Sequence, residues 1–294
     1  MGTSKDFGGQ ENKTPLVPSW LDGETDTDAN NAENGNEPQE SPDDQPSQND
    51  NQEQLPPLPP VHTDNRFRGA RSNFTKYVNS GGTDNRALKK GCNNYVSSAL
   101  GGSKKAAQRM KSSKIVSSNL VSLFSKIREN GLYKTFEYYD IKDFVDRPLK
   151  DALTKLIDIS CLKDIDGGNL DEDIARQAAV QTLQEITKEI KNVEDFENFI
   201  KDEKQINIIL EIFVAKSIKG RLVLDIGKNL ISLPQKPEDL KKIETNLDYF
   251  IRNQVEKALN SIIGNQSIIN NDQIQKTIDS IYQRSYKFLE EVGE

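Results

Sequence analysis

The chain has 294 residues, of which 34% are hydrophobic, and its 39 Lys and Arg stand against 46 Asp and Glu, for a net charge of −7. So low an apolar content argues against a single fold that includes every residue, because too little surface would be buried to offset the entropy of ordering. No apolar run reaches the length of a membrane span and no secretory leader is visible, so we expect a cytoplasmic protein without membrane contact.

The first 22 residues form a short segment with an unusual apolar cluster. Trp20, the only Trp of the chain, lies between Leu16 and Val17 on one side and Leu21 on the other. The segment is too short and too rich in proline to bury this cluster by itself. Because exposed aromatic clusters commonly anchor a segment in a partner's pocket, we predict a linear motif over residues 1–22.

An acidic segment follows over residues 23–65, with eleven Asp and Glu and no Lys or Arg. It has almost no apolar content, so we predict a disordered tether. A flexible chain of this length has a typical end-to-end distance of roughly 36 Å. Near its end, Leu55–Pro60 resembles a polyproline ligand, and it is interpreted either as a stiff spacer or as a docking motif.

The charge changes sign at Arg66, because residues 66–114 hold twelve Lys and Arg and one acid, Asp84. Aromatic side chains are interleaved with these cations, a composition that is typical of surfaces that contact a nucleic-acid backbone. Two alternatives stay open: an acidic protein partner, or neutralisation of the acidic tether in the same chain. The aromatic residues are Phe67, Phe74, Tyr77 and Tyr95. The candidate basic surface consists of Arg66, Arg68, Arg71, Lys76, Lys89, Lys90, Lys104, Lys105 and Arg109, with Arg86, Lys111 and Lys114 in the same segment.

Helical periodicity dominates from residue 66 onward. Within the basic segment we predict helices over 74–79 and 84–99, which end at paired glycines, and one long helix from Ser103 to Gly131. Further helices are predicted over 148–160, 170–191, 194–201, 204–219, 221–232, 237–263 and 271–291. The predicted fold class is all-α: a compact multi-helix domain over 66–294, preceded by a long disordered acidic N-terminal tail.

Few residues could carry catalysis. The one histidine, His62, falls in the predicted tether, and no phosphate-binding glycine loop occurs. Cys92 and Cys161 lie 69 residues apart, without a neighbouring His or the spacing of a metal site, so we interpret them as reduced thiols. Acids cluster at Asp164, Asp166 and 171–173, but their spacing misses the calcium-loop pattern. We expect the acids at 171–173 to interact favourably with the positive N-terminal end of the helix that follows. We predict a protein without enzymatic activity and without a metal.

Motifs at two places resemble a known family. The first are Gly-Thr-Ser at positions 2–4, Phe7-Gly8-Gly9 and Thr14-Pro-Leu-Val-Pro-Ser-Trp-Leu21, which resemble the start of the QatB family, the B component of the Qat anti-phage system. The second are Phe67-Arg-Gly-Ala-Arg-Ser-Asn-Phe-Thr-Lys-Tyr77, Gly101-Gly102-Ser103 and Arg109-Met110. We find no family motif in the tether or in the C-terminal helices.

This resemblance implies partners and a chemical modification. The family implies a defence operon that also encodes an ATPase, a QueC-like enzyme and a TatD-like nuclease. QueC-like enzymes of other defence systems imply that a 7-deazapurine is joined to an N-terminal glycine. That nominates Gly2, with Gly8 and Gly9 as alternatives, and no other cofactor. We expect recognition through Thr3, Ser4, Phe7, Leu16, Val17, Trp20 and Leu21.

The leading hypothesis is a non-enzymatic protein substrate and adapter, with a modified tail and a helical domain that docks on the ATPase or the nuclease. The alternative is a nucleic-acid-binding sensor that uses residues 66–114. A third hypothesis is an effector enzyme that modification unlocks.

Overall fold

The computed structural model describes residues 65–144, 147–163, 165, 168–227, 237–264, 268 and 273–292. The chain divides into two units, Met1–Pro57 and Leu58–Glu294, and every described residue belongs to the second. The described residues form helices and turns, and they include no β-strand. The all-α prediction is therefore confirmed for this part of the chain. The predicted linear motif and, apart from Asn65, the predicted disordered tether lie outside the described residues, and the predicted domain boundaries stay predictions.

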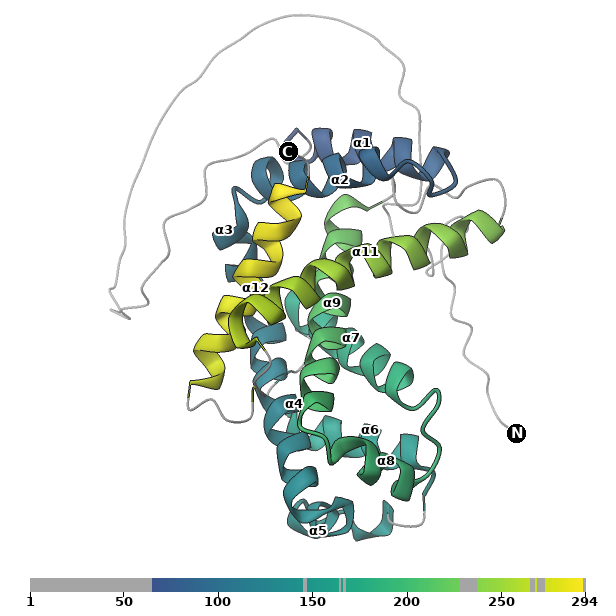
Figure 1. Cartoon of the computed structure of the whole chain (residues 1–294), viewed down its shortest axis with the longest axis vertical. Coiled ribbons are helices and arrows are strands. Elements are labelled where there is room, and N and C mark those ends of the chain that lie inside the picture. Colours follow the sequence, from purple (N-terminus) through teal and green to yellow (C-terminus); the bar gives the residue numbers. More distant parts are fainter. Residues whose placement is uncertain are drawn as a thin grey trace, which may run out of the picture. The chain divides into compact units, whose positions relative to one another are not determined.

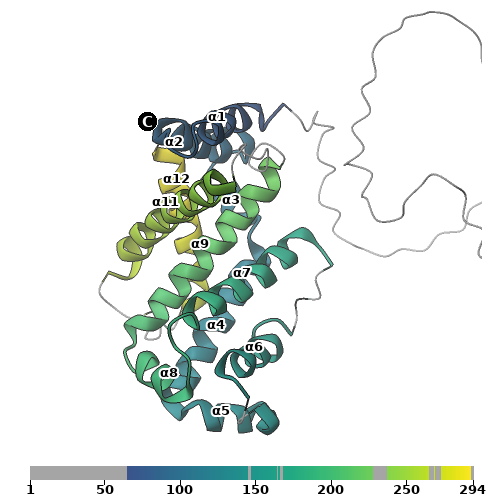
Figure 2. The ribbon, with the colours of Figure 1, turned by 90° about the vertical axis from the view of Figure 1, so that its right-hand side faces the viewer.

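The helices follow one another along the chain with short connections (Figure 1). The first are α1 (Arg68–Asn79), α2 (Asn85–Asn94), a π turn (Tyr95–Ala99), α3 (Ser103–Gln108), α4 (Lys111–Asn130), α5 (Leu132–Tyr138) and a 3-10 turn (Lys142–Phe144). The remaining ones are α6 (Leu149–Ser160), α7 (Leu170–Ile186), α8 (Val193–Ile200), α9 (Lys204–Ile226), α11 (Pro237–Ile263) and α12 (Ile274–Glu291). Figure 1 and Figure 2 both show α1 and α2 at one end of the helical unit and α5 at the other.

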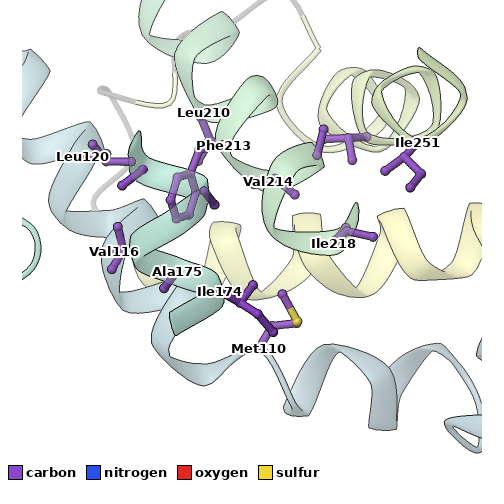
Figure 3. Packing of buried hydrophobic residues seen from close by; sticks show 14 of the residues in the cluster. Met110, Val116, Leu120, Ile174, Ala175, Leu210, Phe213, Val214, Ile218 and Ile251 are labelled. Atoms are coloured by element: carbon purple, nitrogen blue, oxygen red, sulfur yellow. The ribbon is translucent and has the colours of Figure 1, made fainter. Parts of the chain in front are cut away.

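The core is built around α9, which packs against α4, α7 and α11. Apolar side chains cover most of the circumference of this helix, as expected of a helix that other helices surround. Phe213, Val214 and Ile218 of α9 are completely buried. In Figure 3 the labelled side chains of α9 lie between those of α4 and α7 on one side and Ile251 of α11 on the other.

Side-chain caps start several helices where the sequence offers Asp or Asn. Asp84 Oδ1 accepts a hydrogen bond from the N–H of Ala87 at 2.9 Å and so caps α2. Asn169 caps α7 in the same way, and the acids of the first turn, 171–173, favour the positive end of this helix as predicted. Asn192 does the same for α8.

The long helix predicted from Ser103 to Gly131 is wrong, because the chain breaks at Arg109 and Met110 into α3 and α4. Met110 is completely buried, and Figure 3 shows its side chain among the core residues. The N–H of Ser112 in the first turn of α4 donates to Asp171 Oδ2 at 2.6 Å. A side chain from α7 thus satisfies an N–H that a continuous helix would have bonded internally.

The break predicted at Gly220 is also wrong, because α9 runs through this residue to Ile226. A glycine inside a helix costs about 1 kcal/mol relative to alanine, and packing on both sides of α9 outweighs that cost. The predicted end of the second helix needs a smaller correction, since α2 ends at Asn94 and continues as the π turn. The first helix begins at Arg68, earlier than predicted, and α5 was not predicted at all.

Substitution to alanine should have opposite effects on the free energy of unfolding at two glycines, Gly82 and Gly220. Gly82 has a φ of 76°, and a Cβ there would lie 3.0 Å from Cγ1 of Ile243 and 3.2 Å from its Cα. Gly82→Ala should therefore lower the free energy of unfolding by about 2 kcal/mol, through backbone strain and a contact that the backbone of α11 cannot relieve. Chemical denaturation monitored by circular dichroism measures this loss.

Gly220 provides the matched control. A Cβ there would make an ordinary contact of 3.5 Å with Cγ2 of Ile174. Gly220→Ala should raise the free energy of unfolding by about 0.5–1 kcal/mol, because alanine loses less backbone entropy in a helix. Equal effects of the two substitutions would contradict this account of the packing.

Candidate functional site

The residues predicted in the tail lie outside the described residues, so the structure leaves them as predictions. They are Gly2, Thr3, Ser4, Phe7, Gly8, Gly9, Leu16, Val17, Trp20 and Leu21. The same holds for His62 and for the proline-rich segment Leu55–Pro60.

The predicted basic surface is distributed over α1, α2 and α3 at one end of the helical unit. Three of its members, Arg66, Arg71 and Arg109, are half-buried. The exposed cations of this end are Arg68, Lys76, Arg86, Lys89, Lys90, Lys104, Lys105 and Lys111. None of these eight forms an ion pair with another described residue, whereas the neighbouring Lys114 is bound to Asp279 at 3.0 Å. The one acid of the segment, Asp84, is engaged as a helix cap.

The aromatic residues of the same segment are part of the core. Phe67, Phe74, Tyr77 and Tyr95 are all buried, which corrects the interpretation that they alternate with the cations on one surface. The guanidinium of Arg66 lies over the ring of Phe67, 4.6 Å from its centroid. These rings therefore fix α1 and α2 on the domain and cannot stack on nucleobases.

Charges on α7, α9 and α11 behave differently, because they neutralise one another. Lys216 Nζ of α9 donates to Asp248 Oδ2 of α11 at 2.8 Å and lies 3.1 Å from Glu185 Oε2 of α7. Arg252 of α11 donates to Glu211 at 2.6 Å and to Glu185 at 2.7 Å. Each cation of this network contacts two carboxylates, so removing any one side chain would deprive a partly buried charge of a partner. We therefore assign the network a structural role, which is to hold α7, α9 and α11 together.

The pKa values of this network agree with its pairing. Burial opposes ionisation of Asp248, but the hydrogen bond from Lys216 and the charges of Lys216 and Lys219 lower its pKa below the usual range. Burial likewise works against the Lys216 cation, and its bonds to Asp248 and Glu185 nevertheless raise its pKa. Both groups therefore stay charged at neutral pH.

A second polar group connects the basic end of the unit to α9. The hydroxyl of Tyr95 donates to Asp225 Oδ2 at 2.8 Å, and Arg221 Nε donates to the same oxygen at 3.1 Å. Close by, the hydroxyls of Tyr282 and Ser217 lie 2.8 Å apart. Tyr95 and Asp225 are 130 residues apart, so sequence reasoning missed the pair. The available signal was a charged residue near the end of a helix that is otherwise largely apolar.

A groove of about 370 Å³ lies between α7, α9 and α11. Most of its accessible lining is apolar, and Leu224 is 48% exposed. The apolar residues are Val223, Leu224, Leu240, Ile243 and Leu247, beside Gly220. Polar groups come from Gln177, Gln181, Lys219 and Glu244. Sequence reasoning did not find this groove, because three separate helices have to meet to form it.

A smaller pocket of about 220 Å³ lies where α3 meets α11 and α12. It is lined by Ser103, Ile262, Ser280, Gln283, Arg284 and Lys287, and most of its accessible surface comes from apolar atoms, including the aliphatic stems of the polar side chains. The guanidinium of Arg284 lies 4.7 Å from the centroid of the Phe288 ring, and this cation–π contact helps to hold the Arg284 side chain in place. Arg284 was not among the predicted surface residues.

Burial makes the two cysteine thiols of the described residues unreactive. Cys92 and Cys161 are both free and buried. Burial raises the pKa of the Cys161 thiol to about 12 and that of Cys92 further, so neither is a thiolate at neutral pH.

Within the described ranges, no group of three His, Cys, Asp or Glu is placed to hold a metal ion. No helix in this part of the chain combines the length and apolar character that a membrane span requires.

Comparison with known proteins identifies the family. A profile described as Qat anti-phage system associated protein QatB matches residues 101–289, more than half of the chain. The chain belongs to the QatB family. No curated protein and no solved structure matches it.

The QatB match confirms the family that the motifs suggested, but it rests on a different part of the chain. The motifs lie mainly before residue 101, and only Gly101-Gly102-Ser103 and Arg109-Met110 fall within the matched residues. The match extends from α3 into α12 and so includes the C-terminal helices, in which we had found no motif. The groove, the ion-pair network and the smaller pocket all belong to the QatB part, and α1 and α2 precede it. Membership makes the protein a component of the Qat anti-phage system.

Proposed function

We propose that this Qat component is a non-enzymatic substrate and adapter. Its N-terminal tail is recognised by the QueC-like enzyme of the system and receives a 7-deazapurine on Gly2. Its helical domain binds the ATPase or the nuclease of the same operon. The observation that carries the adapter role is the open groove with an apolar lining between α7, α9 and α11, the three helices that the ion-pair network of Lys216 and Arg252 holds together.

Several acids and both thiols among the described residues are not free to react, which supports a binding role. The carboxylates of Glu185, Glu211 and Asp248 are held by cations, and both thiols are buried. Catalysis needs an acid, base or nucleophile that can reach a substrate. The described residues offer binding surfaces instead.

The groove is suited to an amphipathic helix with aliphatic anchors. Its floor and walls come from three packed helices and are therefore rigid, and its polar groups provide hydrogen bonds at the edge. Apolar anchors that fill such a groove supply most of the binding energy in helix-in-groove recognition. We assign this helix to a partner protein of the Qat system.

Leu224→Asp should abolish this contact. The substitution places a charge where an apolar anchor would be buried, and a buried unpaired charge costs several kcal/mol. When the operon is co-expressed, at least ten times less ATPase or nuclease should copurify with the variant. The control is Leu170→Asp, because Leu170 is similarly exposed at 44% and does not line the groove. Equal recovery of the partner with both variants would argue against the groove as the docking site.

The tail half of the proposal has a separate test. The mass of the N-terminal peptide, measured in cells with and without the gene of the QueC-like enzyme, reports the modification directly. An added mass that requires this gene supports the proposal. An unmodified tail in cells that still resist phage would leave the tail as a docking peptide only.

A further inference from the structure

The α1–α3 end of the domain is strongly basic at its surface. Elsewhere in the described part, cations such as Arg128, Lys216 and Arg252 lie within 3.1 Å of a carboxylate oxygen. At this end, eight exposed cations have no carboxylate partner among the described residues. A surface of one sign attracts a polyanion, and it releases counterions when that ligand binds.

The smaller pocket extends this surface onto α12. Ser103 of α3 and Arg284 of α12 line the same space of about 220 Å³, so the cations of α3 and α12 belong to one face. The hydroxyl of Ser103, the amide of Gln283 and the Arg284 guanidinium are the kinds of donor that hold a phosphate group, whereas the Ser280 hydroxyl already donates to the carbonyl of Lys276. This volume is sufficient for one phosphate with some of its water.

Lys287 contributes less to this pocket than Arg284. Its Nζ lies 3.4 Å from Glu290 Oε2 and 3.4 Å from Glu291 Oε1, so its charge is partly neutralised. Arg284 has no carboxylate partner among the described residues. Arg284 is therefore the side chain on which anion binding in the pocket should depend most.

The buried aromatics restrict what kind of polyanion fits. Proteins that bind single strands without sequence preference stack bases on exposed aromatic rings. All four aromatic residues of the basic segment are in the core, and the half-buried ring of Phe288 on α12 is covered by the Arg284 guanidinium, so this face offers mainly charge and hydrogen-bond donors. Such a face reads the backbone of a duplex and carries little sequence preference.

We propose that α1–α3 together with α12 bind the sugar–phosphate backbone of a nucleic-acid duplex, with one phosphate in the pocket beside Arg284. A duplex is favoured over an acidic protein because α1–α3 contribute many exposed cations and one acid, Asp84, which is engaged as a helix cap, and because the pocket adds donors that fit one phosphate. This inference does not depend on modification of the tail or on the groove.

Fluorescence anisotropy of the full-length protein with a labelled DNA duplex of about 20 base pairs tests the proposal. The logarithm of the affinity should fall linearly with the logarithm of the salt concentration, by about 0.9 for each phosphate neutralised. Reversal of Lys89, Lys90, Lys104 and Lys105 to Glu should weaken binding at least tenfold at low salt. An RNA duplex of equal length, measured in parallel, tells which nucleic acid the backbone belongs to.

A matched control separates this face from net charge. Lys134, Lys150, Lys163 and Lys188 lie in or next to α5, α6 and α7, and no ion pair with a described residue holds them. Reversing these four to Glu changes the net charge by the same amount, and it should reduce affinity far less. Circular dichroism of both variants should match that of the unchanged protein.

The pocket has its own variant. Arg284→Gln should weaken duplex binding several-fold and reduce the salt slope by about one unit, because one phosphate contact is lost. Several results would overturn the proposal: no duplex binding at low salt, an equal loss in the control variant, or tighter binding of a single strand. Binding of polyglutamate at the expense of the duplex would assign the face to an acidic protein instead.

Discussion

Replacing Gly2 by Glu is expected to abolish both the modification of the tail and protection against phage. A free α-amine has a pKa near 8, so an appreciable fraction is neutral and nucleophilic at the pH of the cytoplasm. Glycine presents no Cβ to an enzyme that must approach this amine. Glutamate blocks removal of Met1 and crowds the amine, so the N-terminal peptide should show no added mass in cells that carry the whole operon.

Two controls define this result. The melting temperature of the Gly2→Glu variant should equal that of the unchanged protein, because none of the described core residues is changed. Trp20→Ala should lower the efficiency of modification without preventing it, since it removes an anchor and leaves the reacting atom in place. Full protection by a Gly2→Glu variant would exclude the conjugation chemistry, and the adapter role would then rest on the groove alone.

Asp225→Ala is expected to lower the free energy of unfolding more than Gly82→Ala does. The side chains of Asp225 and Arg221 are only 10% and 13% exposed, and Asp225 also accepts the hydrogen bond of the buried Tyr95 hydroxyl. Removing the carboxylate leaves a nearly buried guanidinium and a buried hydroxyl without this partner. The free energy of unfolding should fall by about 3 kcal/mol, and the melting temperature by roughly 6–12 °C.

A combined replacement tests this explanation. Arg221→Met with Asp225→Leu and Tyr95→Phe removes all three polar groups and keeps apolar volume in their place. Such a variant should recover most of the stability, because no polar group is left unpaired. If it is as unstable as Asp225→Ala, the loss reflects packing at the π turn and not an orphaned charge.

The all-α class could be predicted from the sequence because its signals are local. Apolar residues at helical spacing mark α6, α8 and α11 to within a residue or two, and the paired glycines Gly81-Gly82 and Gly101-Gly102 end helices as expected. The family could also be suggested from short motifs, as the match to residues 101–289 then confirmed. The acidic and basic segments follow directly from composition.

Only the tertiary structure shows where packing between helices overrides the local signals of the sequence. Gly220 stays inside α9 because neighbouring helices hold it there, and the turn at Met110 forms because Asp171 of another helix caps α4. The aromatic residues between the cations turned inward because burying a ring contributes more than exposing it beside a charge. The groove, the Tyr95–Asp225 bond and the pocket at Arg284 join residues that are far apart in the chain, and no local pattern in the sequence encodes such distances.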